Sequence, residues 1–247
     1  ATSSMFADCA KQYVILSSVS VYADHGQVAD EDSPLAECPD EFAAECKTIR
    51  ESLAHYGAMK ARCEKAAEAA MPGRVTAIRP GLIVGPGDYS DRFTYWPVRI
   101  FSGGEVMAPG NPTDPVQFID CRDLGEWYIR LVETQAVGTY NGVGPRSRMS
   151  IAETLYGIRA AVDNEISFTW VDADFLEKHE VQPWTQMTVW VPPTDGYEGF
   201  ARVSNRRAIE RGLTFRPLAV TARAGSPHGP EFQLAGDAWR RLSRGRG

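Results

Sequence analysis

The sequence predicts an α/β fold, in which short apolar strands alternate with helices. Residues 13–22 and 75–84 are rich in β-branched and aromatic residues, as is typical of buried strands. Residues 41–71 lie between them and are dense in Ala, Glu, Lys and Met, which favours a helix that ends at Pro72-Gly73. A further helix ending near residue 133 and a strand over 138–143 repeat this order.

The later elements are weaker but can still be located. Ser150 and Glu153 have the spacing of a capping box, which predicts a helix over 150–162. Asp120 or Asp123 is expected to cap the helix that ends near residue 133, and for Asp123 we favour this role over catalysis. Further strands are expected over 105–109, 115–119 and 166–171, and further helices over 3–9, 172–179 and 203–212.

Composition limits the kind of partner that the protein binds. The chain has 247 residues and a formal net charge of −6. An acidic excess argues against a general nucleic-acid-binding protein, which would normally present a basic face. The tail after residue 217 is rich in Gly, Arg and Ser and ends Arg244-Gly245-Arg246-Gly247, and it is better explained as a frayed, solvated terminus than as a nucleic-acid contact. We therefore expect a small-molecule substrate.

Cysteine usage and hydropathy point to the cytoplasm. The five cysteines are odd in number and include no Cys-x-x-Cys pair, which favours a reducing compartment over a disulfide framework or a zinc site. We recognise no secretory leader and no apolar run long enough to cross a membrane. Asp24 and His25 have no third ligand at a suitable spacing, so we expect no metal site there.

The strongest chemical signal is a tyrosine and a lysine four residues apart. Tyr56 and Lys60 fall on one face of the helix predicted over 41–71. A free tyrosine has a pKa of about 10, and a neighbouring ammonium favours the phenolate form. With a serine hydroxyl from the end of the strand at 13–22, this pair provides a general acid and base for a carbinol oxygen. The alternative is an exposed phenol–amine pair without function.

Four motifs in order make the sequence resemble the extended short-chain dehydrogenase/reductase family, which includes NAD-dependent epimerases and dehydratases. The matching segments are the Ser-Ser strand end, the Tyr-x-x-x-Lys helix, the Arg-Pro-Gly strand and a Phe-Ile-Asp segment, at residues 17–22, 56–60, 79–87 and 118–124. The resemblance covers most of the chain and weakens after about residue 217. The family's Gly-x-x-Gly-x-x-Gly turn, which cradles the pyrophosphate, is not found in the sequence.

The resemblance implies a partial Rossmann-like, doubly wound parallel sheet with a small C-terminal substrate-binding lobe. Residues 1–145 would be the C-terminal part of the dinucleotide-binding domain, with insertions that belong to the substrate lobe. Residues 146–247 would be mainly the substrate-binding lobe and the tail. The strand at 13–22 would have one unpaired edge, which favours association, and we expect a homodimer.

The resemblance also implies roles for individual residues. Tyr56 would be the general acid and base, Lys60 its electrostatic partner, and Ser18 the hydroxyl that orients the substrate. The cofactor would be NAD or NADP, between which the sequence does not distinguish. The residues expected to bind it are Ser17, Tyr56, Lys60, Pro80, Gly81 and Ile83.

Substrate contacts are expected from two segments. Ser20 and Tyr22 follow the catalytic serine, and Ser20 is the second candidate for its role. Arg92, Tyr95 and Trp96 form an aromatic segment flanked by arginine, which suits an anionic or sugar-like substrate. A packed helix start with a solvated arginine explains that segment equally well.

The predicted function is that of an NAD(P)-dependent oxidoreductase or epimerase that acts on a carbinol or carbonyl through the Ser-Tyr-Lys site, with a sugar nucleotide as one candidate substrate. Two alternatives remain from the sequence. The first is a truncated, non-catalytic relative that serves as a binding or scaffold protein, because the sequence lacks the glycine turn. A dinucleotide-sensing regulator is disfavoured because a sensor does not need the Ser-Tyr-Lys set.

Overall fold

A computed structural model of the chain describes residues 2–46, 53–88, 90–161 and 164–225. Its central sheet has three parallel strands in the order β1-β2-β7. These strands are β1 (Tyr13–Leu16), β2 (Val75–Pro80) and β7 (Gly138–Gly142). β1 pairs with β2 alone within the described residues, so the predicted open edge is present.

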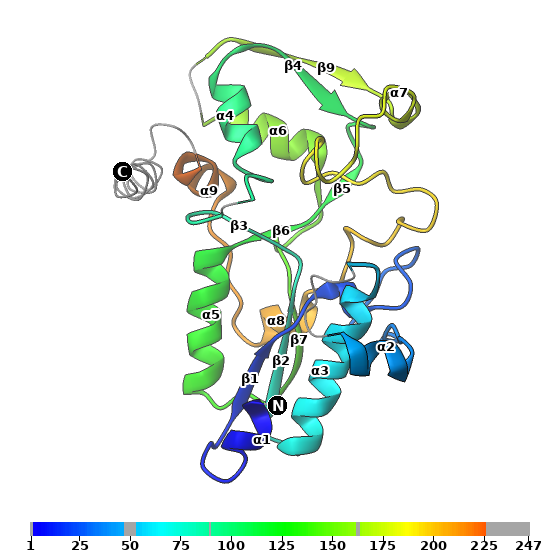
Figure 1. The fold of residues 1–247 in the computed structure, drawn as a ribbon. Helices are drawn as coiled ribbons and strands as arrows, with labels where there is room; N and C mark the ends of the chain where they lie inside the picture. The colour runs from blue at the N-terminus through cyan, green and yellow to red at the C-terminus, as the bar shows by residue number, and fades with distance from the viewer. Residues whose placement is uncertain (1, 47–52, 89, 162–163, 226–247) are drawn as a thin grey trace, which may run out of the picture.

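Helices cover both faces of this sheet, as Figure 1 shows for α3 (Tyr56–Ala70) and α5 (Cys121–Glu133). On one face Trp127 of α5 packs with Ile78 and Tyr140 of the sheet. On the other, Ala67 of α3 packs with Val75. Because hydrophobic side chains from both faces of the strands are buried, the strands read as apolar runs. The predicted α/β architecture with parallel strands is confirmed.

The first predicted strand is shorter than expected. β1 ends at Leu16, and the chain then forms a 3-10 turn, η1 (Val19–Val21). Ser18 caps this turn, because its hydroxyl oxygen accepts a hydrogen bond from the Ser20 N–H. A serine side chain that binds its neighbouring backbone competes with strand pairing, which accounts for the difference.

The second predicted strand is two strands in different sheets. β2 ends at Pro80, and β3 (Leu82–Val84) pairs with β6 (Phe118–Asp120). Proline donates no backbone hydrogen bond, so the ladder is free to change partner at this position. Gly81 lies at the change of direction and faces the cavity described below.

A second region of the molecule lies above this sheet in Figure 1. Its helices are α4 (Tyr95–Phe101), α6 (Ile151–Arg159) and α7 (Ala173–Lys178), and its strand pairs are parallel β4 (Gly104–Pro109) with β9 (Ile166–Val171) and antiparallel β5 (Pro115–Val116) with β8 (Met149–Ser150). Trp96, Ile100 and Leu155 are fully buried in its core. α4 and β4 thus pack with elements that come more than 40 residues later in the chain.

Two of the three predicted helix-capping residues or motifs are present in the structure. The Ser150–Glu153 capping box is present at the start of α6. Asp120 caps α5 by accepting a hydrogen bond from the Arg122 N–H. Asp123 does not cap, because its carboxylate accepts hydrogen bonds from the backbone and side chain of Arg216.

The remaining helices are short: α1 (Thr2–Phe6), α2 (Asp40–Glu45), η3 (Leu53–His55), α8 (Arg206–Glu210) and α9 (Leu218–Ala224). The single helix predicted over 41–71 is wrong, since α2 ends at Glu45, Cys46 is extended and α3 begins at Tyr56. Residues 47–52 of the predicted helix lie outside the described residues, as do residues 162–163. The frayed end predicted after residue 217 is wrong for α9, where the buried Thr221 hydroxyl donates to Asp120. The basic tail at 244–247 lies outside the described residues. None of the helices described has the length and hydropathy needed to span a membrane.

Candidate active site

A cavity of about 350 Å³ lies at the carboxyl ends of the three parallel strands. Ser18 follows β1, Gly81 follows β2 and Val143 follows β7, and all three line it. This edge of a parallel sheet is where α/β proteins bind ligands, since the loops converge there. The other lining residues are Val19, Ser20, Tyr56, Leu82, Arg92, Gln117, Trp184, Val189, Phe200 and Ala201.

Tyr56 and Lys60 lie on one face of α3, as predicted. The half-buried Tyr56 lines the cavity, and the Lys60 Nζ atom is 5.9 Å from the centroid of its ring. The same nitrogen donates a 2.9 Å hydrogen bond to the carbonyl oxygen of Leu16, the last residue of β1. The hydrogen bond fixes the ammonium group between the strand and the tyrosine.

Gly57 explains why Tyr56 lies so close to the serines. A Cβ atom at this position would lie 1.8 Å from the carbonyl oxygen of Ser20. Only glycine permits this approach without movement of one backbone. The first turn of α3 therefore packs directly against η1, and Tyr56 and Ser18 face the same cavity.

The three serines after β1 have different surroundings. Ser18 and Ser20 line the cavity, and the Ser18 hydroxyl donates to the Ser20 hydroxyl at 3.1 Å. Ser17 is 3% exposed, and its hydroxyl has no hydrogen-bond partner in the part of the chain that the structure describes. A buried polar group without a partner is uncommon, and this one directly precedes the residues of the cavity.

The predicted cofactor residues of β2 and β3 are divided between two cavities. Gly81 lines the main cavity, where a Cβ atom would approach a Val143 methyl group to 3.2 Å. Ile83 lines an adjoining cavity of about 280 Å³ that also includes Arg92. Pro80 is buried as the last residue of β2 and lines neither cavity.

Of the predicted aromatic segment, only Arg92 reaches the main cavity. Its guanidinium carbon lies 5.3 Å from the Trp184 ring centroid, in a cation–π contact. Trp96 is fully buried and donates its indole N–H to the Thr188 carbonyl. Tyr95 packs edge-on against Trp96 and does not line the cavity. Trp96 is therefore part of the hydrophobic core, as the packed-helix alternative for this segment predicts.

Tyr22 is also kept from the cavity, because its side chain belongs to a buried polar cluster. It is 2% exposed, donates a 2.6 Å hydrogen bond to Asn141 and accepts one from Arg79. Arg79 forms a 2.6 Å ion pair with Glu64 of α3, and the Glu31 carboxylate accepts from the Asn141 N–H. Burial raises the pKa of the Tyr22 phenol, although Arg79 and Asn141 act in the opposite direction.

Sequence reasoning missed the far wall of the cavity. Gln117, Phe200 and Ala201 come from segments without a recognisable motif. Trp184 belongs to a short apolar stripe with Met187 and Trp190, a pattern that indicates either core or a pocket wall, and Trp184 forms part of the wall. No local signal identifies Gln117, which lies in the single-residue gap between β5 and β6.

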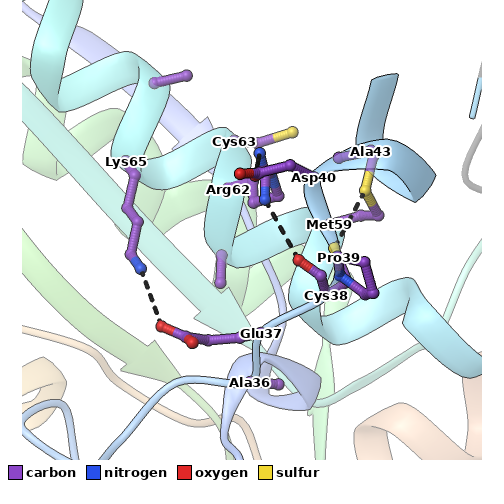
Figure 2. A pocket seen from close by; sticks show the side chains of 12 residues that line it. Ala36, Glu37, Cys38, Pro39, Asp40, Ala43, Met59, Arg62, Cys63 and Lys65 are labelled. Atoms are coloured by element: carbon purple, nitrogen blue, oxygen red, sulfur yellow. Dashed lines mark hydrogen bonds and ion pairs between the residues drawn. The ribbon is translucent and has the colours of Figure 1, made fainter. Parts of the chain in front are cut away.

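A second, larger cavity of about 880 Å³ lies between α3 and the segment that leads into α2, as Figure 2 shows. Arg62 forms an ion pair of 2.6 Å with Asp40, and Lys65 one of 3.8 Å with Glu37. Neither Tyr56 nor Ser18 lines it. Over the described ranges, no group of three or more His, Cys, Asp or Glu side chains is arranged to hold a metal ion.

Comparison with known proteins identifies the fold. No protein-family model matches the chain, and no curated protein matches it in sequence. Solved structures do match, and they show that the chain has the Rossmann-like fold of NAD(P)-dependent epimerases and reductases. The family resemblance read from the motifs is thereby confirmed at the level of the fold.

Three of these structures illustrate the match. The human epimerase family protein SDR39U1 with NADPH has a TM-score of 0.58 and 20% identity, over 90% of this chain and 70% of that chain. A dTDP-4-dehydrorhamnose reductase from Clostridium acetobutylicum has a TM-score of 0.58 and 11% identity, over 89% and 67%. RMD from Pseudomonas aeruginosa complexed with NADPH has a TM-score of 0.54 and 16% identity, over 87% and 65%. The chain also spans only 61% of a similar Burkholderia cenocepacia structure.

Proposed function

We propose that this chain carries the proton-transfer site of an NAD(P)-dependent oxidoreductase or epimerase that acts on a carbinol or carbonyl group. The observation that supports the proposal is the shared cavity of Ser18 and Tyr56, with the Lys60 ammonium beside the tyrosine ring. A hydroxyl, a phenol and a fixed positive charge at the carboxyl edge of a parallel sheet are the groups that this chemistry needs.

Each residue has a distinct role in this proposal. Tyr56 transfers the proton to or from the substrate oxygen, a contribution of roughly 10²–10⁴-fold in rate. Lys60 stabilises negative charge on the phenolate oxygen, and its hydrogen bond to Leu16 holds it in position. Ser18 donates a hydrogen bond to the substrate oxygen and keeps it near Tyr56.

NAD or NADP would supply or accept the hydride when bound. The residues present fit its nicotinamide end. Among the described residues the Ser17 hydroxyl has no hydrogen-bond partner, Gly81 adds no side chain to the cavity at the end of β2, and Lys60 has further N–H groups, beyond the one that binds Leu16, for ribose hydroxyls. Ile83 lies on the adjoining cavity and Pro80 at the end of β2. Since the sequence has no glycine-rich turn, these residues account for the nicotinamide end only.

The proposed substrate is a small molecule such as a nucleotide-linked sugar. Arg92 and Ser20 line the cavity and offer a positive charge and a hydroxyl to it. The similar structures include a dTDP-4-dehydrorhamnose reductase, which is consistent with such a substrate. We also propose a homodimer, because β1 pairs with β2 alone among the described strands and Leu16 at its end is 45% exposed.

Substitution of Tyr56 tests the proposed chemistry. Tyr56→Phe removes only the hydroxyl, so it should lower kcat by at least 10²-fold while the dissociation constant for NADPH stays within about twofold. Turnover would be followed by NADPH absorbance with dTDP-4-dehydrorhamnose as the first substrate. Tyr156→Phe, at an exposed tyrosine of α6, is the matched control. Full activity in Tyr56→Phe would refute the assignment.

The second candidate function is that of a non-catalytic binding or scaffold protein, which the missing glycine-rich turn favours. Titration of the purified chain with NADH and NADPH separates the two candidates. A saturable change in nicotinamide fluorescence that is shared by wild type and Tyr56→Phe supports the enzyme. No saturable signal with either nucleotide supports the scaffold.

A further inference from the structure

Four arginines converge on a separate cavity of about 240 Å³. Arg146 and Arg148 lie on the loop between β7 and β8, whereas Arg202 lies in the segment that leads into α8 and Arg206 is the first residue of that helix. No Asp or Glu lines this cavity. In a chain with a net charge of −6, such a concentration of positive charge is a local feature that general composition does not explain.

These guanidinium groups are largely free of internal partners. Of the four, only Arg206 has an ion-pair partner among the described residues, Glu210 at 3.9 Å. Both side chains of that pair are well exposed, so the pair is weak. Arg202 is half-buried, and Arg146 and Arg148 are exposed. Mutual repulsion among unpaired charges is relieved when an anion binds between them.

The two arginine-bearing segments are tied together by amide side chains. The Asn205 side chain donates hydrogen bonds to the carbonyl oxygens of Val143 and Pro145, at 3.0 and 2.9 Å. Gln117 both donates to and accepts from the backbone of Val203, at 2.9 Å in each case. The loop with Arg146 and the segment with Arg202 are thus held next to each other before any ligand arrives, which lowers the cost of binding.

We infer that this cavity is a binding site for a phosphate-type oxyanion, as in a phosphorylated small molecule. A guanidinium group can donate two parallel hydrogen bonds to two oxygens of one phosphate. Arginine is for this reason common in phosphate-binding sites. The volume suits one or two phosphate groups rather than a long polyanion. Gln117 and Ala201 line both this cavity and the one around Tyr56, so the two sites share a wall.

Binding of inorganic pyrophosphate to the purified chain tests the site directly. Calorimetric titration at constant ionic strength should show saturable binding to wild type. The double variant Arg146→Gln/Arg148→Gln removes two exposed side chains and should weaken binding by at least about tenfold, since each charge-assisted hydrogen bond contributes strongly. Arg159→Gln, at an exposed arginine of α6, is the matched control and should bind as wild type does.

The outcomes separate the inference from the proposed enzyme activity, because no nicotinamide cofactor enters the titration. Arg202→Gln gives a second test at the half-buried arginine, with thermal melting to check that the variant is folded. Tighter binding of UDP than of pyrophosphate would support the phosphate group of a nucleotide as the ligand, and equal binding would support the anion alone. Lack of saturable binding to wild type, or an equal loss in Arg159→Gln, would overturn the site.

Discussion

Two tyrosines, Tyr22 and Tyr56, lie beside basic side chains but in opposite surroundings. Tyr22 is buried with Arg79, whose guanidinium carbon lies 5.2 Å from the ring centroid. Tyr56 lies beside Lys60 at a similar distance, 5.9 Å, but faces a cavity. The phenol–cation pair therefore does not by itself distinguish a structural tyrosine from a chemical one.

The difference lies in the hydrogen bonds of each hydroxyl group. The Tyr22 hydroxyl donates to Asn141 and accepts from Arg79, which leaves little capacity for a substrate. Within the described residues the Tyr56 hydroxyl has no such partner, and its side chain borders open volume. The Arg79 guanidinium stabilises the fold around Tyr22, whereas in our proposal the Lys60 ammonium assists proton transfer by Tyr56.

The largest expected effect is at the buried ion pair that anchors the Tyr22 region. Arg79→Leu leaves the Glu64 carboxylate buried without its partner, which should lower the free energy of unfolding by about 3–5 kcal/mol. The two side chains are only 4% and 9% exposed. Arg62→Leu, which breaks the exposed pair with Asp40, should leave the free energy of unfolding nearly unchanged, because solvent screens that pair. Urea denaturation measures both, and equal losses would contradict the contrast.

An intermediate effect is expected where α3 meets η1 in the Tyr56 region. Gly57→Ala places a methyl group against the Ser20 carbonyl, so the free energy of unfolding should fall by about 1–3 kcal/mol. Turnover should also fall, because Tyr56 and Ser18 move apart. Gly125→Ala in α5, where a Cβ atom meets nothing within 4 Å, should instead stabilise by about 0.4–1 kcal/mol. An unchanged melting temperature in Gly57→Ala would show that the contact is not tight.

The smallest effect separates the two tyrosines by pH. Tyr22→Phe should lower the free energy of unfolding by about 1 kcal/mol at neutral pH, since it removes the donor to buried Asn141. Burial raises the pKa of Tyr22 in the folded protein. Its stabilising contribution is therefore complete below a pH of about 10 and is lost as pH rises through the folded pKa.

Urea denaturation between pH 8 and pH 11 checks this prediction. The deficit of Tyr22→Phe relative to wild type should shrink as the pH rises, because only wild type loses the contribution of the phenol. A deficit that grows toward pH 11 would contradict the assigned direction. Proton transfer by Tyr56 should be unaffected by the same substitution.

Much of the local structure was predictable because it depends on short-range patterns. The strands β4, β7 and β9, the helix α5 and the capping box of α6 all lie close to where periodicity and capping residues predict them. The predicted strand boundaries were wrong where a single residue changes the hydrogen bonds that the backbone makes. Ser18 ends β1 early by capping η1, and Pro80 divides one predicted strand into two.

The sequence by itself determined the order of strands and helices and the presence of Tyr56 and Lys60 on one helix face, since both follow from backbone periodicity. Only the tertiary structure decided that Tyr22 and Trp96 are internal while Tyr56 borders a cavity. It also brought together Arg146 and Arg202, which lie more than 50 residues apart in the chain. The physical reason is that burial depends on the packing of distant segments, which local pattern does not encode.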